Sequence, residues 1–409
     1  MKIERPRGTR DFLPEEMEKR RELEKIFREV VELFGYREVQ TPTFEHLELF
    51  TIKSGEEIIK EIYAFKDKGG RDLALRPELT APVMRMFVNE CSHLPKPLRF
   101  YYFSNCFRYE RPQKGRYREF WQFGAELIGS NSPEAEAEVI LLSYRMLEKA
   151  GVSFELSIGD VNLLRYVLRD IPEKEAAMRL IDKEEFETLR NLLAKYDREE
   201  IYETILQLGE IESVEEAEEV VDYDFSHLKK LCEILDALEL KYFVDFTVAR
   251  GLDYYTGTVF EYYAEGLGAQ KQICGGGSYR LAKLFGGEDV PGTGFAIGFD
   301  RVMELFTKSP KYEPPVVVVS LVESKDAFKI AERLRENGVK VVVDVMGRNL
   351  KKQMSFANDI SAEYAVIIGK KELESGTFSI KDLVTGKQKS LSFEEAVELI
   401  KSKRRIDEE

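Results

Sequence analysis

The sequence is poor in the residues that most often carry acid–base chemistry or bind metal ions. Its 409 residues include three histidines, one tryptophan and four cysteines. The cysteines are Cys91, Cys106, Cys232 and Cys274. None of them forms a CxxC pair, so zinc and dithiol redox sites are not indicated. The histidines, His46, His93 and His227, lie far apart, and each is expected to be a surface or structural residue rather than a general base.

The chain also lacks long apolar runs and an excess of positive charge. No stretch approaches the roughly 18 apolar residues of a membrane span, and the start "MKIERPRGTRDFLPEE" has no apolar signal region. We therefore expect a soluble, cytoplasmic protein with no membrane partner. The net charge of −14 argues against a surface that is basic throughout. It leaves room for a local basic groove, because salt screens charges beyond about 8–10 Å.

Several common catalytic motifs are absent as well. The sequence contains no GxxxxGK[ST] phosphate loop, no GxSxG and no HExxH. The stretch "GTGFAIG" has the wrong spacing for a dinucleotide fingerprint. Phosphate-loop, serine-hydrolase and zinc-protease chemistry are therefore not indicated.

The length of 409 residues predicts two or three domains, because a domain typically holds about 150 residues. An amphipathic helix is expected over 15–34, and two strands around the charged loop "RPQKGRYRE" form a long hairpin. Residues 161–237 are acidic and helical with no strand signal, which predicts a helical insertion. The catalytic core is then discontinuous, over 1–160 and 238–308.

A linker, "KSPKYEPP", separates this region from a different pattern. Beyond it, apolar strands such as "VVVVS" and "EYAVIIG" alternate with amphipathic helices. We predict a separately folded α/β domain over 316–409.

Arginines interleaved with aromatic residues mark one candidate site. The segment "FRYERPQKGRYREFWQF" places Arg108, Arg111, Arg116, Arg118 and Lys114 among aromatic side chains. Guanidinium groups grip phosphate oxygens in pairs, and aromatic faces stack on bases. On the residues alone, a nucleotide site and a solvated hairpin tip both stay open.

Charged residues in a second segment raise a related question. The run "ARGLDYYTGTVFEYY", 249–263, resembles a strand but carries Arg250, Asp253 and Glu261. Buried charges need partners, so these residues either lie on a solvated face or line a pocket for a charged ligand. Glu78 and Glu126 are candidate wall carboxylates for an ammonium or imidazole group, with helix-cap or rim positions as the alternative.

These motifs resemble those of the histidyl-tRNA synthetase family of class II aminoacyl-tRNA synthetases. "FRYERPQKGRYREFWQFGAELIG" is similar to motif 2, "GFAIGFDRV" to motif 3, and the run around Thr41 and Pro42 to motif 1. "ARGLDYYTGTVFE" and "GGGSY" resemble the two histidine signatures. The second signature departs from its usual form, with Ser278 where arginine is usual and Arg280 where aspartate is usual.

The resemblance implies a fold and a reaction. It implies an α+β catalytic domain with a mostly antiparallel class II sheet, a helical insertion and a C-terminal α/β anticodon-binding domain. It implies that ATP activates L-histidine as histidyl-adenylate, which then esterifies tRNA(His). ATP is a substrate, Mg²⁺ accompanies its phosphates, and no protein-bound metal is expected. The family works as a homodimer built on motif 1.

The resemblance also implies residue roles. Arg108 and Arg250 would hold the α-phosphate and the histidine carboxylate, as the catalytic pair. The ATP-binding residues would be Arg108, Arg116, Phe120 and Arg301. The histidine-binding residues would be Glu78, Leu79, Thr80, Arg108, Gln122, Glu126, Arg250, Tyr254 and Tyr255. Close backbone approach to the ligand is implied for Gly275, Gly276 and Gly277, with a plain turn as the alternative. The tRNA-binding residues would be Gln113, Arg348, Lys351 and Lys352.

Two other functions stay open at this stage. One is a catalytically silent histidine-binding paralogue that regulates histidine biosynthesis. The other is a synthetase for another amino acid, such as threonine, proline or glycine.

Overall fold

The computed structural model describes residues 3–54, 56–110, 116–248, 255–268, 271–308 and 313–406. It divides into two compact units, Met1–Ser309 and Pro310–Glu409. Among the described residues, no helix has the length and apolar character needed to cross a bilayer.

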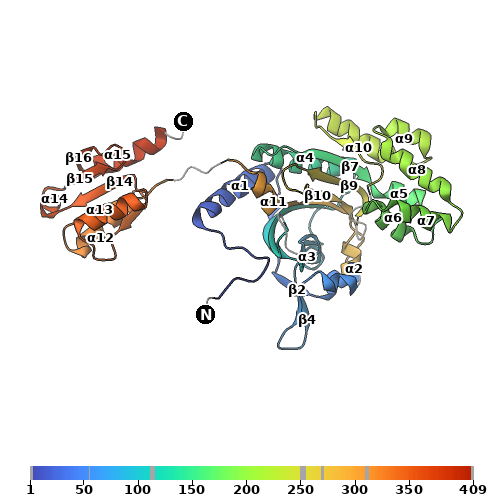
Figure 1. Cartoon of the computed structure of the whole chain (residues 1–409), viewed down its shortest axis with the longest axis horizontal. Helices are drawn as coiled ribbons and strands as arrows, with labels where there is room; N and C mark the ends of the chain where they lie inside the picture. Colours follow the sequence, from blue (N-terminus) through green and yellow to red (C-terminus); the bar gives the residue numbers. More distant parts are fainter. Residues whose placement is uncertain are drawn as a thin grey trace. The chain divides into compact units, whose positions relative to one another are not determined.

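Unit 1 is built on an eight-stranded sheet in the order β1-β5-β6-β11-β10-β9-β7-β8 (Figure 1). Its strands are β1 (Arg37–Glu38), β5 (Leu98–Phe107), β6 (Glu119–Ile128), β7 (Glu155–Asp160), β8 (Phe243–Val244), β9 (Tyr255–Tyr263), β10 (Gln272–Tyr279) and β11 (Gly292–Gly298). Among the residues that the structure describes, only the edge pairs β1/β5 and β7/β8 of this sheet are parallel. The mostly antiparallel sheet that was predicted is therefore confirmed.

Strands β5 and β6 form the predicted long hairpin, in register from Leu98 opposite Ile128 to Phe107 opposite Glu119. A smaller sheet, β2-β4-β3, lies in the same unit. Its strands are β2 (Phe44–His46), β3 (Ala64–Lys66) and β4 (Asp72–Leu75).

Helices outside the insertion pack on these two sheets of unit 1 through apolar side chains. They are α1 (Pro14–Leu33), α2 (Glu48–Ser54), α3 (Thr80–Met86), α4 (Pro133–Ala150) and α11 (Phe299–Leu305), with short helical segments at Glu56–Lys60, Phe87–Cys91 and Ala282–Phe285. The bounds of α4 follow from its sequence. The Ser132 side chain accepts from the Ala135 amide, Pro133 occupies the first turn, and Gly151 adopts a positive φ of 76° at the end.

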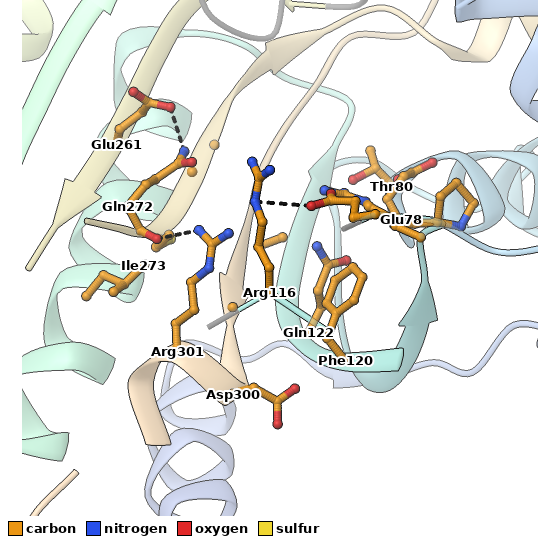
Figure 2. Close-up of a pocket in the computed structure, with 18 of the residues that line it drawn as sticks. Glu78, Thr80, Arg116, Phe120, Gln122, Glu261, Gln272, Ile273, Asp300 and Arg301 are labelled. Carbon is orange, nitrogen blue, oxygen red and sulfur yellow. Dashed lines mark hydrogen bonds and ion pairs between the residues drawn. The ribbon is translucent and has the colours of Figure 1, made fainter. Parts of the chain in front are cut away.

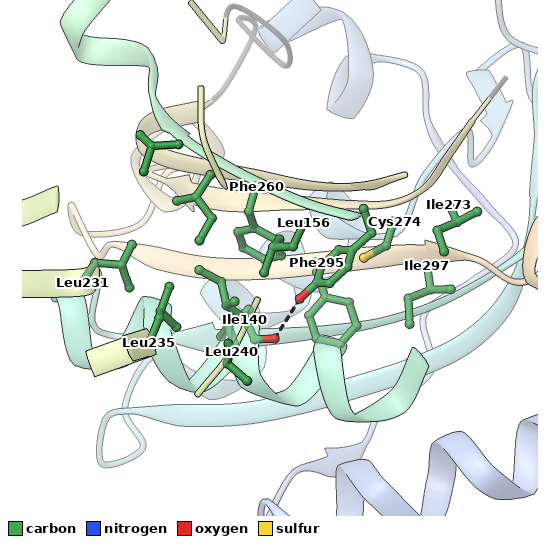
Figure 3. Close-up of a cluster of buried hydrophobic side chains, with 14 of the residues drawn as sticks. Ile140, Leu156, Leu231, Leu235, Leu240, Phe260, Ile273, Cys274, Phe295 and Ile297 are labelled. Carbon is green, nitrogen blue, oxygen red and sulfur yellow. Dashed lines mark hydrogen bonds between the residues drawn. The ribbon is translucent and has the colours of Figure 1, made fainter. Parts of the chain in front are cut away.

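The residues between Val161 and Ala237 form six helices and no strand. They are α5 (Val161–Val167), α6 (Lys174–Asp182), α7 (Phe186–Ala194), α8 (Glu199–Glu210), α9 (Val214–Val220) and α10 (Ser226–Ala237). Their apolar faces join the core of the sheet in one continuous cluster. Figure 3 shows Leu231 and Leu235 of α10 beside Ile140 of α4, under Phe260 and Phe295 of the sheet. The insertion therefore shares its core with the strands.

Unit 2 is a five-stranded sheet in the order β13-β12-β14-β15-β16 with helices packed on it. Its elements are β12 (Val316–Ser320), α12 (Ser324–Glu336), β13 (Val341–Val343), α13 (Leu350–Asp359), β14 (Tyr364–Ile368), α14 (Lys370–Ser375), β15 (Thr377–Asp382), β16 (Gln388–Ser392) and α15 (Phe393–Ile406). The first three strands of this order are parallel and the last two pairings antiparallel. The predicted α/β fold of this region is confirmed.

Candidate active site

A cavity of about 560 Å³ opens over the large sheet of unit 1. It is bordered by strands β6, β9, β10 and β11, by the start of α3 and by the start of α11. The predicted site residues on its wall are Glu78, Thr80, Arg108, Arg116, Phe120, Gln122, Tyr255, Gly275, Gly276 and Arg301. Residues from distant parts of the sequence therefore meet in one place.

Two cationic side chains come from the segment that joins β5 to β6. Arg108 donates from Nε to the Pro77 carbonyl at 3.0 Å, and its guanidinium lies 5.2 Å from the Phe120 ring centre. Arg116 forms an ion pair with Glu110, 3.1 Å from Nε to Oε2. These contacts hold both side chains at the wall of the cavity, and a guanidinium group carries five N–H donors with which to meet a ligand.

Arg301 approaches the same space from the first turn of α11, and Figure 2 shows it beside Arg116. It donates to the Gln272 carbonyl at 2.6 Å. Burial, followed by the like charges of Arg116 and Arg108, lowers the pKa of Arg301. Arg116 and Arg108 thus each repel Arg301 across one cavity, and a polyanion placed between these groups would relieve that repulsion.

Asp300, next to Arg301, anchors this end of the site. Its Oδ1 accepts from Arg10 and from Arg20, each at 2.6 Å, and its Oδ2 accepts from the Trp121 amide at 2.6 Å. The carboxylate is almost fully buried, which is tolerable because two cations and an amide pair with it. Asp300 therefore ties the N-terminal segment and β6 to the helix that carries Arg301. The residue pattern did not single it out, although its place beside a motif arginine is a usable signal.

At the other end of the cavity, Glu126 is buried just behind the wall at Thr80. Its oxygens accept from the Tyr279 hydroxyl at 2.6 Å and the Tyr102 hydroxyl at 3.2 Å. Burial raises the pKa of Glu126 to about 7, against the opposing effect of the hydrogen bonds from Tyr279, Thr80 and Tyr102. Gly294 on β11 makes room for it, since a Cβ there would lie 1.9 Å from its Oε2. The carboxyl group is thus poised to change charge near neutral pH.

The remaining wall residues on this side are polar and partnered. Both oxygens of Glu78 accept from the Ala81 amide at 3.2 Å, which caps the start of α3. Gln122 accepts from the Cys106 thiol at 3.3 Å. The Glu78 side chain therefore accepts from the first turn of α3, as the helix-cap alternative predicts. The same carboxylate also lines the cavity (Figure 2).

Leu79 does not line the cavity with its side chain. The side chain is 1% exposed and packs in an apolar cluster with Val83 and Met84 of α3. The prediction of a histidine-binding role for Leu79 is thus limited to its backbone.

The three glycines Gly275–Gly277 lie within strand β10, so the turn alternative is wrong. A Cβ on Gly276 would lie 2.4 Å from the Gly294 carbonyl oxygen, and one on Gly277 would lie 2.6 Å from the Thr258 carbonyl oxygen. Neighbouring strands, as well as the cavity, therefore require small residues here.

Glu261 is a cavity residue to which no role was assigned from sequence. It is 6% exposed on β9, lines the cavity and accepts from the Gln272 side-chain amide at 2.5 Å. The carboxylate of Glu261 therefore faces a pocket rather than solvent. Asp182, at the end of α6, also reaches the wall, so the insertion contributes to the cavity.

Three predicted residues, Gln113, Arg250 and Tyr254, lie outside the described residues. In unit 2, Arg348 pairs with Asp344 at 2.8 Å and stacks 4.5 Å from the Phe356 ring centre. Lys351 and Lys352 are exposed in the first turn of α13.

Comparisons with known proteins show which families the two units match. Residues 8–302 match the family described as Histidyl-tRNA synthetase, and residues 315–403 match the family described as Anticodon binding domain. The chain is 59% identical over 409 residues to the histidine--tRNA ligase of Archaeoglobus fulgidus, covering 98% of this chain and 100% of the relative.

Solved structures are similar over most of the chain. Apo histidyl-tRNA synthetase of S. aureus is 28% identical with a TM-score of 0.73, covering 98% of this chain and 100% of that one. A protein of Bacillus halodurans C, described as an ATP phosphoribosyltransferase regulatory subunit/histidyl-tRNA synthetase, is 27% identical with a TM-score of 0.78. That match covers 90% of this chain and 99% of the other.

Proposed function

This chain belongs to the histidyl-tRNA synthetase family, and from that premise we propose that it attaches L-histidine to tRNA(His) at the expense of ATP. The reaction has two steps, formation of histidyl-adenylate with release of pyrophosphate and transfer of the histidyl group to the tRNA 3′ end. The assignment rests on one observation. A single cavity is lined by three guanidinium groups and, at its other end, by polar residues that include a carboxylate.

In the first step, a carboxylate attacks the α-phosphate of a polyanion. Negative charge grows on the phosphate oxygens, so positioned cations lower the barrier more than a base would. We propose that Arg108 meets the α-phosphate and the histidine carboxylate, and that Arg116 meets the γ-phosphate. Arg301 and Phe120 would sandwich the adenine. The support is that all four line one cavity, and that Arg301 lies within electrostatic reach of Arg108 and Arg116.

Magnesium would enter with the phosphates of ATP. The described residues contain no cluster of three or more His, Cys, Asp or Glu suited to hold a metal by themselves. Mg²⁺ commonly binds through one or two carboxylates together with substrate phosphates. Glu261 is a buried wall carboxylate that fits this pattern. The ion would supply charge neutralisation at the phosphates, and Glu261 would orient it.

Histidine would occupy the opposite end. We propose that Glu78 and Thr80 meet its α-ammonium and that Gln122 lies near its carboxylate. Glu126 and Tyr255 would pair with the imidazole nitrogens. A site that pairs both ring nitrogens rejects apolar side chains, since these would leave buried polar groups without partners.

The experiment that tests the function is ATP–pyrophosphate exchange with a panel of amino acids. Exchange that depends on histidine, and not on threonine, proline or glycine, is the expected result. Exchange driven equally by another amino acid would contradict the assignment. The regulatory paralogue is not favoured, since residues 315–403 match an anticodon-binding domain and the arginines proposed to bind ATP line the cavity.

We propose that unit 2 contacts the anticodon through α13. Replacing both Lys351 and Lys352 by Ala should raise the KM for tRNA about tenfold, because removing a cation that meets a phosphate weakens nucleic-acid binding. Pyrophosphate exchange, which needs no tRNA, should stay at the parental rate. The exposed pair Lys370 and Lys371 of α14 provides a matched control. An unchanged KM for tRNA in the Lys351 and Lys352 variant would contradict the proposal.

We also propose that the chain forms a homodimer through the region of Thr41 and Pro42. Phe44 of β2 and Phe65 of β3, 54% and 43% exposed, lie opposite Leu75 and Leu73 of β4 and therefore share one face of the small sheet. Exposed aromatic residues on one face are typical of an interface. Sedimentation velocity should give twice the chain mass, and Phe44→Glu should shift the boundary towards the monomer. A parental monomer at micromolar concentration would contradict this proposal.

A further inference from the structure

A buried carboxylate on the far side of the active-site strands has no role in the reaction described above. Glu136 of α4 is 1% exposed, and its side chain meets strands β9 and β10. Its Oε2 accepts from the Thr258 hydroxyl at 2.7 Å, and its Oε1 accepts from the Ser278 hydroxyl. Both hydroxyl residues are themselves buried. Ser278 is one of the two positions at which the second histidine signature departs from its usual form. Its hydroxyl group thus has a hydrogen-bond partner in Glu136.

The same carboxylate also contacts the helical insertion. The Nε2 atom of His227, at the start of α10, lies 2.7 Å from Glu136 Oε2. The His227 side chain is 42% exposed, so it reaches inward from the surface to this buried group. One carboxylate therefore joins three elements, the strands β9 and β10 of the active site and the last helix of the insertion.

A second set of contacts connects the insertion to β9. From α5, Asn162 donates to the Thr256 carbonyl at 2.9 Å, and Arg165 donates to the Tyr255 carbonyl at 2.9 Å. Tyr255 lines the cavity, and Glu261 lies further along the same strand. The insertion is therefore hydrogen-bonded to the strand that carries these two wall residues.

We propose that Glu136 and His227 are positioning residues for the histidine end of the active site, through which the insertion sets the placement of β9 and β10. The proposal rests on the proposed function, since it concerns use of histidine. Glu136 acts from behind the strands, Thr258 and Ser278 transmit its position, and His227 is its link to the insertion. Ser278 precedes Tyr279, which donates to Glu126 and pairs with Tyr255, so the coupling acts at the histidine end. Glu261 and Gln272, the residues of β9 and β10 nearest the proposed ATP end, lie towards the opposite end of this strand pair.

The charge of the His227 imidazole is part of its contact with Glu136. The hydrogen bond to Glu136 is the largest cause that raises the pKa of His227, and the charges of Glu136, Asp160 and Glu134 add to it, while burial acts in the opposite direction. Asp224, just before α10, also lies within electrostatic reach of the imidazole. The charged pair is therefore complete below the raised pKa and is lost as the pH rises through it.

The test uses the full-length protein and three variants at exposed or half-exposed positions. His227→Ala removes the link, and His227→Gln retains a hydrogen-bond donor that does not titrate. Lys230→Ala breaks the exposed ion pair between Lys230 and Glu134, which also joins α10 to α4 but does not involve Glu136. Histidine-dependent pyrophosphate exchange is measured from about pH 6 to about pH 9, on both sides of the ordinary histidine pKa, with thermal unfolding as a check on folding.

The expected result for His227→Ala is a rise of about three- to tenfold in the KM for histidine, with the KM for ATP within about twofold. His227→Gln should restore the KM at neutral pH. The ratio of the parental KM to that of the Gln variant should rise with pH, because only the parental pair loses its charge. Lys230→Ala should match the parental protein.

Three results would overturn the inference. They are parental kinetics in a folded His227→Ala variant, an equal change in the KM for ATP, and an equal effect of Lys230→Ala. An absence of histidine-dependent exchange in the parental protein would instead contradict the proposed function, so the two failures are distinguishable.

Discussion

Arg108→Ala should fold as the parental protein does and lose histidine-dependent pyrophosphate exchange by about a thousandfold. The reason is that a positioned cation at the site of growing phosphate charge contributes about 10²–10³ in rate, or more where it meets the transferred group directly. Arg108 is only partly buried and lines the cavity, so the mutation removes the cation with little loss of core packing. Stopped-flow or exchange kinetics at saturating ATP would measure the loss.

Arg280→Ala is the matched control for this prediction. Arg280 occupies the position of the second histidine signature where aspartate is usual. It pairs with Asp289 at 3.1 Å, is 41% exposed and does not line the cavity. Its replacement should leave exchange within about twofold of the parental rate. The resemblance predicts a loss as large as that of Arg108 for Arg250→Ala, a residue outside the described part of the chain. Near-parental exchange in Arg108→Ala would contradict the placement of the α-phosphate.

Glu126→Gln should raise the KM for histidine about 10- to 100-fold and leave the KM for ATP nearly unchanged. An ionised carboxylate contributes about 1.5–3 kcal/mol to a hydrogen bond with a polar ligand, and the neutral amide loses most of this. Because burial raises the pKa of Glu126 to about 7, the parental site gains its acceptor charge as the pH rises through that value. The ratio of the variant KM to the parental KM should therefore increase from about pH 6 to about pH 8.

Taking the ratio of the two KM values cancels the effect of the titration of the substrate histidine, because that effect is the same for both proteins. Glu119→Gln provides the control, since Glu119 lies on the same strand and accepts from Asn105 instead. Equal effects of Glu126→Gln on histidine and on ATP would show that Glu126 supports the wall through Tyr102 and Tyr279 and does not read the substrate side chain.

Local patterns in the sequence determined much of this protein. Apolar spacing predicted α1, and the two strand-like segments around a charged loop predicted the β5–β6 hairpin. The lack of strand signal over 161–237 agrees with six consecutive helices there. The specific motifs also identified three arginines of the cavity, its wall carboxylate Glu78 and the buried Glu126 behind the wall. These features depend on periodicity and on residue chemistry, which are visible within short windows of the chain.

The tertiary structure alone decided which charges are partnered and what surrounds them. Glu126 meets Tyr279 across 153 positions, and Asp300 meets Arg10 across 290. Glu136 joins β9, β10 and α10, which no window of the sequence contains together. The physical reason is that burial and charge pairing arise from the order of strands in the sheet, β6-β11-β10-β9, and not from local preference. The order of the strands determines which carboxylates are buried away from water and which side chains pair with them. It therefore determines which pKa values are shifted and in which direction.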